Sequence, residues 1–243
     1  MTQDSLQSVP LLQSLRDRLA VEGLHVVLPL SVAAFDEVMV PLGARGAGGL
    51  VDGAAGAVLI GDGGPAFFGR FRDAAPYASG VDHPLDDFTR ACVTAAVTEV
   101  LAPRQLDFRV SFPFGGSGAG PLLPFQRLGR AAGLPEPGPL GLQIHPEYGP
   151  WWAYRALVVV AASLDVEPPL LPWCPPCDRP CVRGCASHRF AAGGGPPGGA
   201  EICGDDCGAR LRCPVGREHA YPPDQIAFHL RAREALLRAL REP

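Results

Sequence analysis

Seven of the eight cysteines in this 243-residue chain lie within 40 residues of one another, in a segment rich in Pro and Gly. They form two groups with short internal spacings: Cys174, Cys177, Cys181 and Cys185, followed by Cys203, Cys207 and Cys213. Spacings of two or three residues let successive thiolates turn toward one centre. A segment with so little hydrophobic periodicity is expected to fold around metal rather than around a core of its own.

The first cysteine group and the end of the second predict one metal centre. Cys213 precedes Pro214, as in ferredoxin runs whose last cysteine ligates the cluster of another run. On this pattern a [4Fe–4S] cluster has the ligands Cys174, Cys177, Cys181 and Cys213. The alternative scheme has four consecutive ligands, with Cys185 in place of Cys213. A zinc ion, which four thiolates satisfy equally well, and free thiols are the other possibilities.

A second cluster would have three thiolates from the remaining residues, Cys185, Cys203 and Cys207. Its fourth site would fall to His188, to His219, to a substrate or to no ligand. The eighth cysteine, Cys92, lies on an apolar helical stripe and is expected to be a core residue.

Composition places the rest of the chain among globular proteins. Hydrophobic residues make up 47% and charged ones 19%, while 30 Gly and 27 Pro predict long loops. All 21 cationic residues are Arg and the net charge is -4, which argues against a nucleic-acid surface, a Walker lysine and a Schiff-base lysine. The longest apolar run, residues 156–164, is about half a membrane span, so no membrane association is expected. Without a recognisable secretory signal we expect a cytoplasmic protein.

Hydrophobic periodicity predicts a mixed α and β body. Helices are predicted at residues 4–22, 84–100, 120–132 and 224–240, and strands at residues 24–30, 57–61, 106–112, 142–145 and 155–162. We therefore expect an α+β cofactor-binding domain over residues 1–166, a small irregular Cys-rich metal-binding module over residues 167–222, and a C-terminal helix over residues 223–243.

One segment of the body resembles a known family. Residues 141–160, GLQIHPEYGPWWAYRALVVV, resemble the cobalamin-processing CblC family, in which a strand ends in I-H-P-x-[FY]-G-x-W-[FW]-A and an Arg follows. Residues 57–68 and 81–88 are similar to earlier elements of that family. The resemblance implies a flavin-reductase or nitroreductase-like antiparallel sheet with flanking helices, and a corrinoid or flavin cofactor. The cofactor-binding residues that it implies are His145, Trp151, Trp152 and Arg155.

The cysteine segment resembles the two-cluster module that follows a cobalamin-binding domain in epoxyqueuosine reductases and reductive dehalogenases. CPPCDRPCVRGC at residues 174–185 resembles their first run, and CGDDCGARLRCPVG at residues 203–216 resembles their second. In those proteins a corrinoid lies beside the proximal cluster, which supplies it with electrons. This chain departs from the pattern: three residues separate Cys177 from Cys181, Ala186 replaces the usual Pro after Cys185, and an eighth ligand is absent.

Together these features predict an iron–sulfur redox protein that passes electrons through a [4Fe–4S] cluster to a corrinoid or flavin near His145. A redox partner protein or a small-molecule reductant would supply the electrons. The alternative is a non-catalytic corrinoid-binding or trafficking protein in which a structural zinc or iron–sulfur site holds the cysteine segment together. The glutathione-binding arginines of the CblC family lie beyond the shared motif, so its glutathione-dependent dealkylation is not implied. Candidate proton donors are Asp82, His83, Asp86 and Asp87.

Overall fold

The computed structural model describes residues 10–74, 83–114, 123–166, 174, 177–184 and 208–229. The chain divides into two compact units. The first falls within Met1–Leu134 and Ala153–Leu170, and the second within Pro135–Trp152 and Leu171–Pro243. The segment that contains His145 is therefore part of the same unit as the clustered cysteines.

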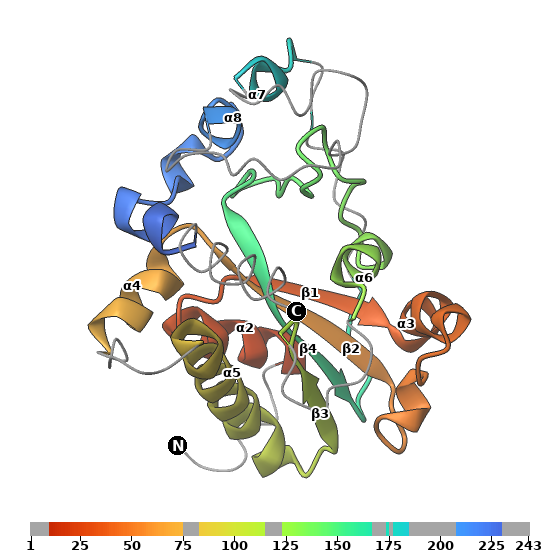
Figure 1. The fold of residues 1–243 in the computed structure, drawn as a ribbon. Helices are drawn as coiled ribbons and strands as arrows, with labels where there is room; N and C mark the ends of the chain where they lie inside the picture. Colours follow the sequence, from red (N-terminus) through yellow and green to blue (C-terminus); the bar gives the residue numbers. More distant parts are fainter. Residues whose placement is uncertain are drawn as a thin grey trace, which may run out of the picture. The chain divides into compact units, whose positions relative to one another are not determined.

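A four-stranded sheet forms the centre of the first unit, in the order β1-β2-β4-β3 (Figure 1). The strands are β1 (Val26–Ser31), β2 (Gly56–Gly63), β3 (Phe108–Ser111) and β4 (Trp152–Val160). β1 pairs antiparallel with β2, and β3 pairs antiparallel with β4. Every residue of β2 is buried, as are six successive residues at the end of β4, because these two strands occupy the middle of the sheet. Their near-continuous apolar sequences reflect burial on both faces.

Helices surround this sheet. They are α2 (Leu11–Val21), α3 (Val32–Met39), α4 (Ala66–Asp73), α5 (Pro84–Leu101) and α6 (Phe125–Ala131), with single 3₁₀ turns at Val40–Leu42, Ala47–Gly49 and Ala102–Arg104. α2 packs against α5 and buries Leu12, Leu15 and Leu19, whose spacing places them on one helical face. α3 contacts β1, β2 and α6, and α4 contacts β2. Ser31 caps α3, since its hydroxyl accepts a hydrogen bond from the Ala34 backbone N–H.

The described residues of the second unit have little regular structure. Its helical elements are α7 (Pro180–Arg183), α8 (Gly208–Leu211), a 3₁₀ turn at Arg217–His219 and residues 223–229. α7 and α8 contact each other. In place of a strand at residues 142–145, an isolated bridge joins His145 to Gly149.

The predicted α+β body with a sheet and flanking helices is confirmed, but individual elements differ. The strand predicted at residues 142–145 is wrong, because Pro146 and the positive φ of Gly149 close a tight turn there. The sequence analysis also missed α3 and α4, which are both only eight residues long. Residues 223–229 of the predicted terminal helix are helical, and residues 230–240 lie outside the described part.

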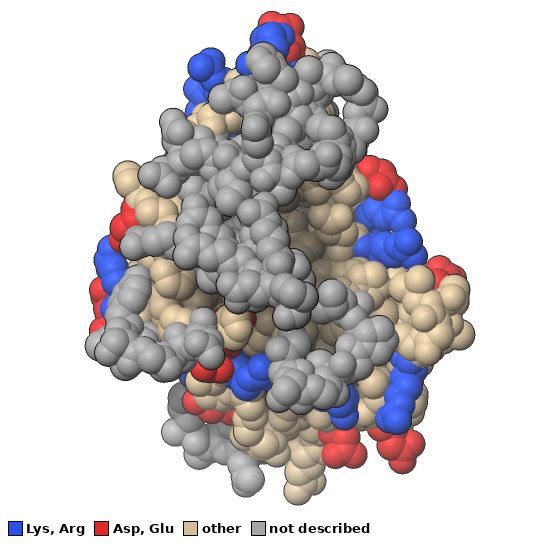
Figure 2. Space-filling view, in the orientation of Figure 1, with Lys and Arg blue, Asp and Glu red and all other residues tan. Residues whose placement is uncertain are grey.

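Two surface properties bear on function. In the described part of the chain, no helix combines the length and apolarity needed to cross a membrane. On the face that Figure 2 shows, basic side chains lie beside acidic ones in the described regions.

Candidate metal and cofactor sites

Four of the clustered cysteines line a single pocket of the second unit. The pocket is small, with a cavity volume of about 20 Å³, and its cysteines are Cys174, Cys177, Cys181 and Cys213. The rest of its lining consists of prolines and aliphatic residues, Ile144 and Val215 among them. This is the cysteine set that the cross-ligation scheme selects, in which Cys213 completes the first group. Cys185, Cys203 and Cys207 lie outside the described residues.

The packing of two short helices places the more buried pair of these cysteines. Cys181 belongs to α7, and Cys213 comes two residues after α8 ends. A Cβ added to Gly208, at the start of α8, would lie 2.9 Å from the carbonyl oxygen of Gly184, at the end of α7. Glycine is needed there because the two backbones approach so closely. Cys181 and Cys213 are buried, whereas Cys174 and Cys177 are exposed.

The thiols in this pocket influence one another's ionisation. Burial raises the pKa of Cys174, and the neighbouring thiolates of Cys177 and Cys181 raise it further. Burial likewise raises the pKa of Cys213, and the other three cysteines add to that effect. Deprotonating several of these thiols together is therefore costly without a cation to balance their charge.

The donor chemistry of the pocket fits a metal centre. Four sulfur donors in an apolar surround are the ligand set of [4Fe–4S] clusters and of structural zinc sites. Among the described residues, no three Cys, His, Asp or Glu side chains lie at chelating distances in this ligand-free arrangement. The thiols thus share a pocket, but in this arrangement the described residues do not form a metal site.

His145 lies at the head of a tight turn and directly follows Ile144, a lining residue of the cysteine pocket. Its Nδ1 accepts hydrogen bonds from the backbone N–H groups of Glu147 at 3.2 Å and of Tyr148 at 3.3 Å. The ring is 8% exposed, and burial, with a smaller contribution from His219, lowers the pKa of His145 to about 4. The imidazole is therefore neutral at pH 7 and carries its proton on Nε2.

The two tryptophans of the implied cofactor site are buried in the same unit. Trp152 donates a hydrogen bond from Nε1 to the carbonyl oxygen of Gln143 at 2.8 Å, and its ring centroid lies 5.8 Å from that of His145. Trp151 packs instead against Tyr221, with ring centroids 5.4 Å apart. The rings of Tyr148 and His219 meet edge to face at 4.7 Å. His145 and Trp152 thus share one aromatic contact, and Trp151 and Tyr221 share another.

Arg155, the fourth implied cofactor residue, belongs to the first unit. Its Nε and one terminal nitrogen donate to the two carboxylate oxygens of Asp62, at 2.7 and 3.1 Å. Asp62 is fully buried and Arg155 is 7% exposed. The guanidinium also lies 5.4 Å from the centroid of the Phe67 ring. The sequence analysis missed Asp62, although one acid within the buried strand AVLIGDG signals a buried partner.

The fold changes the ionisation of Asp86, one of the candidate proton donors. Burial raises its pKa, while the charges of His83, Arg155 and Arg90 act in the opposite direction. Asp86 and Asp87 lie in the first turn of α5, where carboxylates also stabilise the helix dipole. Asp82 lies outside the described residues.

Comparisons with known proteins bear on the fold. No protein-family model matches the sequence, and no curated protein matches it either. The structure is similar to that of a C. elegans B12-trafficking protein CblC, a human MMACHC homologue, with a TM-score of 0.61 and 17% identity over 93% of this chain and 91% of that one. It is also similar to epoxyqueuosine reductase from Streptococcus thermophilus, with a TM-score of 0.57 and 12% identity over 86% of this chain and 67% of that one.

A selenomethionine-labelled epoxyqueuosine reductase gives a TM-score of 0.52 at 12% identity, covering 78% of this chain and 54% of that one. These low identities establish likeness of fold alone. The two families that the sequence resembles are therefore also families whose fold this chain shares.

Proposed function

We propose that this protein is an iron–sulfur redox protein that holds a [4Fe–4S] cluster through Cys174, Cys177, Cys181 and Cys213. The observation that carries the proposal is that these four residues, drawn from segments more than 30 residues apart, line one apolar pocket. The alternatives are a bound zinc ion and free thiols, and metal analysis distinguishes both from a [4Fe–4S] cluster. Bound there, the cluster would supply one-electron transfer at low potential.

The residues of the pocket have distinct roles in this proposal. The four thiolates bind the metal, and the aliphatic and proline side chains exclude water from it. Arg217 donates a hydrogen bond from Nε to the carbonyl oxygen of Cys213 at 3.1 Å, which fixes the turn that presents this cysteine. Electrons would come from a redox partner protein or a small-molecule reductant.

We place the electron-accepting cofactor, a corrinoid or a flavin, beside His145. Two backbone N–H groups hold Nδ1, while Nε2 has no hydrogen-bond partner within the described residues, so the ring can present an N–H to a ligand. The adjacent residue, Ile144, lines the cysteine pocket, which keeps the two proposed sites close. The shared fold with a B12-trafficking protein and with epoxyqueuosine reductase favours the corrinoid.

Anaerobic purification followed by metal and sulfide analysis tests this function. The expected product is a brown protein with about four iron and four sulfide per chain, and dithionite should give it the electron paramagnetic resonance signal of a reduced cluster. A colourless protein with stoichiometric zinc would contradict the redox function.

A second candidate is a non-catalytic corrinoid-binding or trafficking protein in which the cysteines hold a structural metal. The observation that favours it is the match to the B12-trafficking protein over nearly the full length of both chains. In that case the metal would be redox-silent, and chelation would unfold the second unit without altering the first. Corrinoid binding that persists in a zinc-loaded, dithionite-inert protein would select this candidate.

A further inference from the structure

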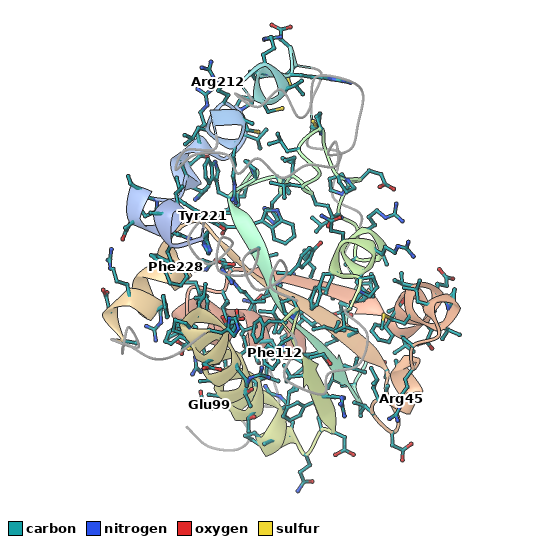
Figure 3. All side chains as sticks on the ribbon, viewed as in Figure 1. Arg45, Glu99, Phe112, Arg212, Tyr221 and Phe228 are labelled. Carbon is teal, nitrogen blue, oxygen red and sulfur yellow. The ribbon has the colours of Figure 1, made fainter. Side chains whose placement is uncertain are left out.

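The second unit contains a group of buried or partly buried polar side chains, of which only Trp151 belongs to the implied cofactor site. We call Trp151, Arg210, Tyr221 and Gln225 the Gln225 group; Tyr221 is labelled in Figure 3. Trp151 precedes β4, Arg210 lies on α8, and Gln225 belongs to the helical residues 223–229.

Three members of the group hold polar atoms without hydrogen bonds. Gln225 is completely buried, yet neither its Oε1 nor its Nε2 has a hydrogen-bond partner among the described residues, and Nε1 of Trp151, which is 2% exposed, also lacks one there. Nε of Arg210 likewise has no hydrogen-bond partner among the described residues. Buried polar groups in native proteins are nearly always hydrogen-bonded, because they lose their water on burial. Three such side chains together mark a place where a bound group would gain hydrogen bonds.

Ring contacts place Trp151, Arg210 and Tyr221 together. The guanidinium carbon of Arg210 lies 4.7 Å from the ring centroid of Trp151 and 4.7 Å from that of Tyr221. The ring of His229 lies 5.6 Å from that of Tyr221, and Gln225 is one helical turn before His229 on the same face. Gln225 is thus directed to the side where Tyr221 lies. Arg210 is only partly buried, which gives the group a route to solvent.

The donor or acceptor character of the atoms without partners indicates which chemical group would bind here. Trp151 Nε1 and Arg210 Nε only donate, whereas the Gln225 amide needs both an acceptor and a donor. A carboxylate would satisfy the donors but would leave Oε1 of Gln225 without a hydrogen bond. A primary carboxamide meets both needs, since its N–H₂ donates to Oε1 and the two lone pairs of its carbonyl oxygen accept from two of the three donors.

From this match we propose that the Gln225 group is a binding site for a primary carboxamide. Corrinoids carry such carboxamides around the edge of the ring, so the site would bind one amide side chain of that cofactor. The corrinoid as the source of the amide rests on the proposed function, whereas the amide chemistry of the site does not.

The first test uses propionamide, a carboxamide without any corrin ring, and the full chain labelled with ¹⁵N at its three indoles. Substitution Trp151→Phe identifies the Trp151 signal. Propionamide should move that indole N–H resonance downfield in a saturable way, because the N–H gains an acceptor, and propionate at equal concentration should not. No shift with propionamide, or an equal shift with propionate, would overturn the carboxamide site.

Two buried glutamines provide a matched pair of variants. Gln225→Leu should abolish the propionamide shift and leave the protein at least as stable, since it removes an amide without partners. Gln143→Leu is the control, because Gln143 is also buried in this unit but donates from Nε2 to the carbonyl oxygen of Pro135 at 3.0 Å. That variant should lose stability and retain the shift. A Gln225→Leu protein that still responds to propionamide contradicts the proposal.

The second test identifies the source of the amide with cobinamide, whose binding changes its visible absorption. Gln225→Leu should bind cobinamide about tenfold more weakly than the parent, as expected for one or two lost hydrogen bonds. If the parent and the variant bind cobinamide equally, this site does not bind the corrinoid. If the parent binds propionamide but no cobinamide, the carboxamide site stands and the corrinoid part of the proposed function fails.

Discussion

Gly149 and Gly216 lie backbone against backbone in the second unit. A Cβ on Gly149 would overlap the carbonyl group of Val215, and a Cβ on Gly216 would overlap the carbonyl group of Tyr148. Both glycines have positive φ, +56° and +65°. One glycine closes the turn that begins at His145, and the other closes the turn that follows Cys213, so this contact joins the candidate cofactor residue to the candidate metal ligand.

Replacing either of these glycines with alanine should separate the two turns. Gly149→Ala and Gly216→Ala are each expected to cost about 2 kcal/mol or more of unfolding free energy and to lower the iron content, because the clash is with backbone that cannot rotate away. Urea unfolding and iron analysis measure both effects. Gly141→Ala is the control, since Gly141 has a φ of +71° in the same unit but a Cβ there would meet nothing within 4 Å. If all three variants behave alike, the contact between the turns has no special role.

The lowered pKa of His145 makes the stability of the protein depend on pH. The unfolded chain binds a proton at this residue below about pH 6.5, whereas the folded protein does so only below about pH 4. The unfolding free energy should therefore fall as the pH drops from about 6.5 to about 4, by up to about 3 kcal/mol, and this contribution should be constant outside that window. Chemical denaturation at a series of pH values measures it.

His145→Asn is the matched variant for this prediction. The Asn side-chain oxygen can accept the same two backbone N–H groups, as Asn does in Asx-turns, and it has no proton to gain. The variant should lose most of the stability change between pH 4 and pH 6.5. An unchanged pH profile would show that the titration belongs to another group.

The buried pair of Arg155 and Asp62 predicts a non-additive effect on stability. Asp62→Leu alone leaves a buried guanidinium without its carboxylate and should cost about 3–5 kcal/mol, and Arg155→Met alone should cost a similar amount. The double variant should be more stable than either single one, because no uncompensated charge remains. Thermal or urea unfolding of the three variants measures this coupling, and simple additivity would argue against a tightly paired interaction.

The sequence predicted those parts of the fold in which hydrophobic periodicity is long or uninterrupted. The stripe in α5 and the apolar runs of β2 and β4 gave correct elements, because each buries a whole face against its neighbours. α3 and α4 were missed because eight residues hold too few turns for a clear pattern. The segment at residues 142–145 is apolar like a strand. Pro146 and Gly149 form a turn directly after it, so only an isolated bridge between His145 and Gly149 forms there.

For the candidate site, short cysteine spacings and Cys213-Pro214 predict a metal centre at Cys174, Cys177, Cys181 and Cys213, and this stays a prediction. Among the described residues these four cysteines line one pocket, because contact between α7 and α8 brings Cys213 there. By contrast, no local pattern marks Arg210 or Gln225, because their roles depend on the residues that the fold packs around them. The assignment of His145, Trp151, Trp152 and Arg155 to a cofactor site stays a prediction.

Iron and sulfide content of four cysteine variants tests the central claim most directly. With cross-ligation, Cys213→Ala should lose the same cluster as Cys177→Ala, whereas Cys185→Ala should retain it. Cys92→Ala is the control, because Cys92 lies on α5 in the first unit and its removal should change stability modestly and leave the iron content unchanged. A Cys213→Ala protein with as much iron and sulfide as the parent, alongside a Cys185→Ala protein without them, would contradict the four-cysteine site proposed for this pocket.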